Sequence, residues 1–123
     1  MTSYSDNFDL LIALICHLGS TDRASRTPTF IAKDLSFEKK HVETVLSGFP
    51  AFFRRSSNTS KKPDSQGDHF YTLHLRYSRR RIDAEEDGES NPLSAEEIDM
   101  LINLVTDMVS QEQANSRSFN ELQ

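Results

Sequence analysis

The chain has 123 residues with 36% hydrophobic content, which suits one domain with a single modest core and an appended arm. No apolar run approaches the roughly 20 residues that a membrane span needs, and the first six residues lack the basic and apolar regions of a signal peptide. A single cysteine excludes an internal disulfide and suits a reducing compartment, so the sequence predicts a cytoplasmic protein.

The net charge of −5 is distributed unevenly along the chain. Residues 23–82 hold 13 Lys and Arg against five Asp and Glu, a local balance of +8. Residues 83–123 hold one basic residue against 11 acidic ones, a balance of −10. A basic segment of this size indicates a surface that contacts phosphates, and a solvated basic surface balanced by acidic arms is the alternative.

Apolar residues recur at helical spacing from Phe8 to Leu18, which predicts a first helix capped by Asp6 or Asn7 and ended by a left-handed Gly19. This helix is apolar over much of its circumference, so we expect it to be covered on two sides.

Thr27-Pro28 predicts the start of a second helix over about 28–35, in which Phe30, Ile31 and Leu35 face inward. A turn at Ser36-Phe37 then leads to a third helix over about 38–47. Its predicted buried stripe is Val42, Val45, Leu46 and Phe49. The opposite face consists of Lys39, Lys40, Glu43, Thr44 and Ser47, with His41 at the boundary.

Two strands are predicted next, over residues 52–57 and 69–77, because Tyr71, Leu73 and Leu75 alternate with more polar positions. The 11 residues 58–68 between them are polar and too long for a tight hairpin. We expect a mobile tip that carries Lys61 and Lys62, with Arg54 and Arg55 on opposite faces of the first strand.

The run Ile31-Ala32-x-x-Leu35-x-Phe37, followed by Val42, Val45, Leu46 and the two strands, resembles the winged helix-turn-helix proteins. The resemblance covers about half of the chain. It implies an α+β, mostly α fold of three helices plus a β-ribbon wing, with a short strand in 26–29 that pairs with the ribbon. It further implies that residues 1–82 bind duplex DNA, with the helix over about 38–47 in the major groove and the wing over 52–77 on the backbone. The candidate DNA-binding residues are Lys39, Lys40, His41, Glu43, Thr44, Arg54, Arg55, Lys61 and Lys62.

Glu43 lies in the middle of the proposed DNA face and would repel phosphate. Two interpretations remain open: Glu43 accepts a hydrogen bond from a cytosine amino group, or it pairs with Lys39 or Lys40 on its own helix.

Residues 83–93 are interpreted as an acidic linker, which either acts as a spacer or folds over the basic face and inhibits it. Ser94 and Glu97 then form a capping box for a last helix over about 95–113, followed by a tail that is expected to fray. The apolar stripe of this helix either covers the first helix or pairs with a second chain, and we interpret it as a dimerisation helix. The stripe consists of Ile98, Leu101, Ile102, Val105, Met108 and Val109.

Enzymatic motifs are missing: there is no Gly-rich phosphate loop, paired-cysteine motif or Gly-x-Ser-x-Gly elbow. The sequence therefore predicts neither an enzyme nor a cofactor, a metal or a small-molecule ligand. It predicts a homodimeric, sequence-specific regulator of transcription, such as a repressor, whose partners are double-stranded DNA and itself. The alternative is a winged-helix module that binds another protein and no DNA.

Overall fold

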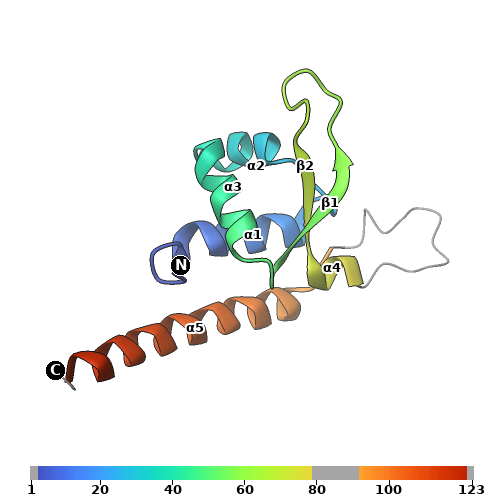
Figure 1. Cartoon of the computed structure of the whole chain (residues 1–123). Helices are drawn as coiled ribbons and strands as arrows, with labels where there is room; N and C mark the ends of the chain where they lie inside the picture. The colour runs from blue at the N-terminus through green and yellow to red at the C-terminus, as the bar shows by residue number, and fades with distance from the viewer. Residues whose placement is uncertain (1–2, 79–91, 122–123) are drawn as a thin grey trace.

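A computed structural model describes residues 3–78 and 92–121 of the chain. It has a mostly helical α+β fold with one small antiparallel sheet. Figure 1 shows α5 running along one side of the molecule, while the loop between the two strands projects at the opposite side. Within the described part, no helix is long and apolar enough to cross a membrane. The elements in order are α1 (Phe8–Ser20), α2 (Pro28–Leu35), α3 (Lys39–Gly48), β1 (Phe53–Thr59), β2 (His69–Leu73), α4 (His74–Ser78) and α5 (Ala95–Glu121).

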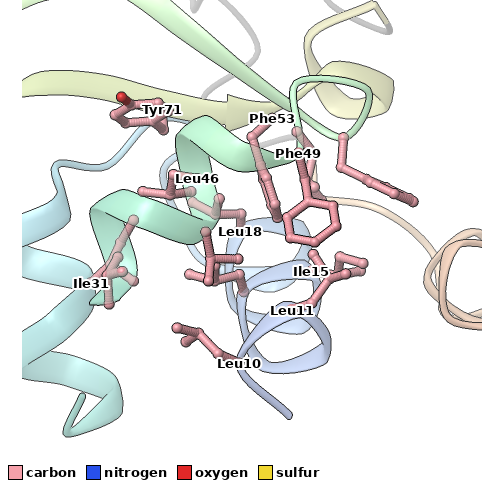
Figure 2. Packing of buried hydrophobic residues seen from close by; sticks show 14 of the residues in the cluster. Leu10, Leu11, Ile15, Leu18, Ile31, Leu46, Phe49, Phe53 and Tyr71 are labelled. Carbon is pink, nitrogen blue, oxygen red and sulfur yellow. The ribbon is translucent and has the colours of Figure 1, made fainter. Parts of the chain in front are cut away.

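Helix α1 is the centre of the core, as its broad apolar surface predicts. Its buried apolar side chains face α3 and β2 on one side and α5 on another. Figure 2 shows Leu11, Ile15 and Leu18 beneath the side chains of α3 and β1. The expected N-cap is wrong in its detail: Asn7 precedes the helix, but its side chain donates to the carbonyl of Ser3 instead of capping.

Helices α2 and α3 are joined by a tight turn, in agreement with the predicted boundaries. Thr27 caps α2 by accepting a hydrogen bond from Phe30 N, and Ser36 ends it in the left-handed conformation with φ of 61°. The buried residues of α3 are those that the spacing predicts, Val42, Val45 and Leu46, so its opposite face is left to solvent.

Strands β1 and β2 form a hairpin whose base is paired to the segment before α2. Arg26 and Tyr71 exchange two backbone hydrogen bonds of 2.9 and 2.8 Å, which confirms the expected pairing at residue 26. The hairpin loop differs from the open tip that we expected. The backbone of Ser60 bonds to Asp68 and Gly67, and its hydroxyl lies 2.7 Å from that of Ser65. Gly67 has a φ of +88°, a conformation that favours glycine.

The second strand is shorter than predicted, because the chain leaves the sheet after Leu73 and forms the short helix α4. His74 N donates to the carbonyl of Phe52, and the turn that follows carries Arg76 into the core. Arg76 is 1% exposed and donates from Nη1 to the carbonyl of Leu18 at 2.9 Å. A basic residue of the predicted second strand therefore satisfies a carbonyl near the end of α1.

Helix α5 begins with the predicted capping box: Ser94 N donates to Glu97 Oε1 at 2.8 Å, and Glu97 N donates to Ser94 Oγ at 3.2 Å. The expected role of Gly19 is wrong, since α1 continues through it to Ser20 and ends at an extended Thr21. Gly19 instead lets the start of α5 pack closely against α1, because a Cβ at this position would lie 3.3–3.4 Å from carbons of Ile98 and Leu93.

The other end of α5 is held by the N-terminal segment. Glu112 accepts hydrogen bonds from the backbone N–H groups of Tyr4 and Ser5, and from the hydroxyls of Ser3 and Ser5. Together these bonds lower the pKa of Glu112, although partial desolvation opposes them. The helix extends to Glu121, beyond the predicted end near residue 113, because no proline or glycine interrupts the sequence there.

Gly19→Val should destabilise the fold by about 1–3 kcal/mol, since the added carbons would overlap Ile98 and Leu93 at the start of α5. Urea unfolding followed by circular dichroism measures this loss. Ser20→Val serves as the control, because Ser20 is exposed at the adjacent position and its replacement should cost about 0.5 kcal/mol or less. Equal losses in the two variants would contradict a close contact at Gly19.

Candidate nucleic-acid interface

The solvent-facing side of α3 holds the residues that the sequence assigns to DNA. Lys40, His41, Glu43 and Thr44 are all exposed, while Val42 between them is fully buried. The hydroxyl of Thr44 donates to the carbonyl of Lys40 at 2.9 Å, which leaves its lone pairs free to accept. The exposed face of α3 therefore presents one cation and several hydrogen-bonding groups to a partner.

Lys39 has a different role from its neighbours, because it joins α3 to the hairpin. Its Nζ donates to Asp68 Oδ1 at 2.9 Å, and the second oxygen of Asp68 accepts from the backbone and hydroxyl of Thr29. The Asp68 side chain is 8% exposed. One carboxylate thus fixes the start of α2, the start of α3 and the start of β2 relative to one another.

The contacts of Asp68 shift both partners toward their charged forms. Partial burial alone would raise the pKa of Asp68, but the hydrogen bonds from Thr29 and Lys39 together lower it. The hydrogen bond to Asp68 raises the pKa of Lys39. Because Lys39 already has an acidic partner, it is less able to bind a phosphate than the sequence suggests.

Asp68→Asn should destabilise the protein by about 1–3 kcal/mol at pH 7, because charge-assisted hydrogen bonds are lost. The pKa of Asp68 is lower in the folded state than its ordinary value of 3.8, so this stabilisation is present above pH 3.8 and disappears as the pH falls through the folded value. Urea unfolding of both proteins from pH 7 to 2.5 should show the difference shrinking below about pH 4. A difference that stays constant with pH would contradict the ion pair.

Glu43 makes no ion pair with Lys39, because Lys39 is paired with Asp68. Glu43 is exposed, and its carbonyl accepts a hydrogen bond from the hydroxyl of Ser47. Its carboxylate contributes only a through-space attraction that raises the pKa of Lys39, after the larger effects of Asp68. Among the described residues, Glu43 forms an ion pair with neither Lys39 nor Lys40, so the predicted pairing is corrected, while base contact stays a prediction.

Arg54 and Arg55 lie beside the end of α3. Both line a hollow of about 480 Å³ that also includes Ser47 of α3. Arg55 is exposed, whereas Arg54 is half-buried with its guanidinium carbon 3.9 Å from the centre of the Tyr77 ring. Of the two arginines, Arg55 is the freer to reach a phosphate.

Lys61 and Lys62 are exposed on the hairpin loop and do not line the hollow that contains Arg54 and Arg55. They line a second hollow together with Thr29 and Phe30 of α2. The sequence-based expectation for Phe30 is wrong, since this ring is 43% exposed and lies 4.2 Å from the guanidinium of Arg26. The pattern of polar and apolar residues over 26–30 does not predict this stacking, because the stacking depends on the conformation of the loop before α2.

The predicted dimerisation stripe of α5 is largely used within the chain. Val105 is buried in the core of its own chain and is 0% exposed to solvent. Ile98 and Leu101 pack against the same hydrophobic cluster. Val105 is therefore corrected from an intermolecular to an intramolecular contact. The other three members, Ile102, Met108 and Val109, are half-buried. Among the α5 residues whose side chains are described, the large apolar side chains that are exposed are instead Met100 and Leu104, at 56% and 48% exposure.

The described residues contain no group of three or more His, Cys, Asp or Glu placed to hold a metal ion. Residues 79–91, which include most of the predicted acidic linker, lie outside the described residues, whereas Leu93 at the end of that linker is buried in the core cluster. No family model, curated protein or solved structure matches the chain.

Proposed function

We propose that this chain is a winged helix-turn-helix regulator of transcription that binds duplex DNA as a homodimer. The observation that carries the proposal is the placement of α3, whose polar face is open to solvent directly beside the hairpin. An exposed helix of this kind can enter a major groove, while an adjacent hairpin follows the backbone.

The connection of the elements supports this class. Two helices joined by the tight turn at Ser36 are followed by a hairpin, and the base of that hairpin pairs with Arg26 before α2. The ion pair between Lys39 and Asp68 sets the hairpin against α3, which would let both touch one DNA duplex.

The exposed cations divide into two kinds of contact. Lys40 on α3 would reach base edges or adjacent phosphates, assisted by His41 and Thr44. Arg55, Lys61 and Lys62 would hold the backbone, and Arg54 would contribute less because it stacks on Tyr77. Lys39 would position the hairpin and add positive potential without making a direct contact.

Dimerisation would use the outer strip of α5, where Met100, Leu104 and Met108 recur at intervals of four residues. These positions share one face of a helix, and two of the three are exposed. The strip flanks the side of α5 that Val105 buries, so a second chain could cover it without disturbing the core. A two-fold axis there would place two α3 helices on one duplex.

Selection from a library of random duplexes, followed by gel shift, tests the proposal. We expect an enriched two-fold symmetric site, bound with an affinity that falls steeply with salt. Four exposed cations per protomer predict a slope of log affinity against log salt of about −4 for each protomer. Absence of any enriched site, together with a slope near zero, would contradict DNA binding.

A second candidate is the protein-interaction module, and one feature of α5 favours it. Glu96, Asp99 and Asp107 surround the exposed Met100 and Leu104. Acidic residues around an apolar strip suit a basic amphipathic partner better than a second copy of the same strip. Light scattering separates the two, since the regulator should be a dimer by itself and the module a monomer.

A further inference from the structure

A cleft lies between the N-terminal part of α2 and the hairpin loop, and Arg55 is not among the residues that line it. It has a volume of about 580 Å³, and we name it the α2–hairpin cleft. One wall is formed by residues within 23–30 and the other by residues 59–65, and Phe70 of β2 also lines the cleft. Its volume falls within the range of about 300–1,000 Å³ that is typical of small-molecule sites.

Both walls of the cleft are fixed by hydrogen bonds. Arg26 is joined to Tyr71 by two backbone bonds, and Thr29 is held by Asp68. The opposite wall is closed on itself, because Ser60 and Ser65 are buried and share a 2.7 Å hydroxyl contact. A site with both walls ordered in advance requires little rearrangement to bind a ligand.

The charge of the cleft is strongly positive. Arg23, Arg26, Lys61 and Lys62 line it against one acidic residue, Asp64. Hydroxyl groups from both walls, which can donate to an oxyanion, lie among these cations. This composition favours an anion over a cation or a neutral molecule.

The cleft also has an aromatic component. Phe30 is 43% exposed on one wall, and the guanidinium carbon of Arg26 stacks 4.2 Å from the centre of its ring. The buried Nε of Arg26 has no hydrogen-bond partner among the described residues. Phe70 supplies a second ring to the cleft.

We propose that the α2–hairpin cleft binds a small organic anion that carries a flat aromatic ring. Arg26, Lys61 and Lys62 bind the anionic group, and Phe30 and Phe70 contact the ring. The structure thus assigns a ligand site to a chain whose sequence gave no sign of one.

The proposal goes beyond DNA binding and does not depend on it. Lys61 and Lys62 are shared by the cleft and the proposed DNA surface, so a bound anion would neutralise two backbone contacts. Ligand binding is therefore measured without DNA, and the failure of one proposal leaves the other intact.

The experiment titrates the full chain with three probes: phenyl phosphate, inorganic phosphate and benzyl alcohol. Calorimetry gives affinities, and amide NMR spectra locate the site. We expect phenyl phosphate to bind at least about tenfold more tightly than inorganic phosphate, because only phenyl phosphate uses both components of the cleft. Benzyl alcohol should show no saturable binding. The amide signals that move should be those of residues 26–30 and 59–65.

Arg26→Gln should weaken phenyl phosphate binding by at least about tenfold, since it removes a charge-assisted contact while the backbone bonds to Tyr71 persist. Arg55→Gln is the matched control, because Arg55 is exposed on β1 and lines a different hollow. If Arg26→Gln does not fold, Lys61→Gln with Lys62→Gln on the exposed loop replaces it, with the same expected loss. Equal affinities for phenyl and inorganic phosphate, or equal losses in the cleft and control variants, would overturn the proposal.

Discussion

Lys40→Glu is expected to weaken binding to the selected duplex by about 10- to 100-fold, while Lys33→Glu leaves it within about twofold. Both lysines are exposed, and both substitutions change the net charge equally. They differ in position, since Lys40 lies on the open face of α3 and Lys33 on the last turn of α2. The comparison therefore separates a specific contact from the general effect of charge.

The reason for the large effect is that Lys40 is the cation of α3 without an acidic partner in the described structure. Lys39, beside it, is bound to Asp68. Reversal at Lys39 would also place a carboxylate against a second carboxylate and disturb the hairpin, which makes it a poor probe of DNA contact. Gel shifts at several salt concentrations give the affinities, and circular dichroism confirms the fold. Equal weakening by the two variants would show that α3 makes no local contact with DNA.

Val105→Asp and Leu104→Asp are expected to have opposite consequences although they are adjacent on α5. Val105 is 0% exposed, so an aspartate there should cost about 3–5 kcal/mol as an uncompensated buried charge. Small domains are stable by about 5–15 kcal/mol, so this variant loses much of its stability. Leu104 is 48% exposed, and Leu104→Asp should change the free energy of unfolding of the single chain by about 0.5 kcal/mol or less.

Light scattering completes this second test. Leu104→Asp should convert the proposed dimer into a folded monomer, because it places a charge at the centre of the strip formed with Met100 and Met108. Asn103→Asp is the control, since it adds the same charge at an adjacent exposed position outside the strip. A dimer that withstands Leu104→Asp would place the subunit contact elsewhere, and a stable Val105→Asp variant would contradict the packing of α5 on the core.

The periodic features of the sequence predicted the helices well. Three apolar positions of α3 have the burial that their spacing indicates, and the capping box at Ser94 and Glu97 forms as written. These features depend on residues close in sequence, which interact in the same way in any fold that contains the helix.

The mistaken expectations share a different cause. Gly19 lies within α1, where the absence of a side chain lets Ile98 and Leu93 approach closely. Arg76 lies outside the sheet, where it donates a hydrogen bond to the carbonyl of Leu18 in α1. Phe30 is exposed and lines a hollow together with the hairpin loop. Each outcome depends on a second segment, whose position no local pattern reveals.

The sequence by itself determined the succession of three helices, a hairpin and a long amphipathic helix, together with the basic character of residues 23–82. Only the tertiary structure decided which cations remain open to a partner, since the partner of Lys39 is Asp68, 29 positions later in the chain. It also decided that Val105 packs inward while Leu104 stays exposed. The physical reason is that spacing fixes the face on which a side chain lies, whereas packing fixes what that face meets.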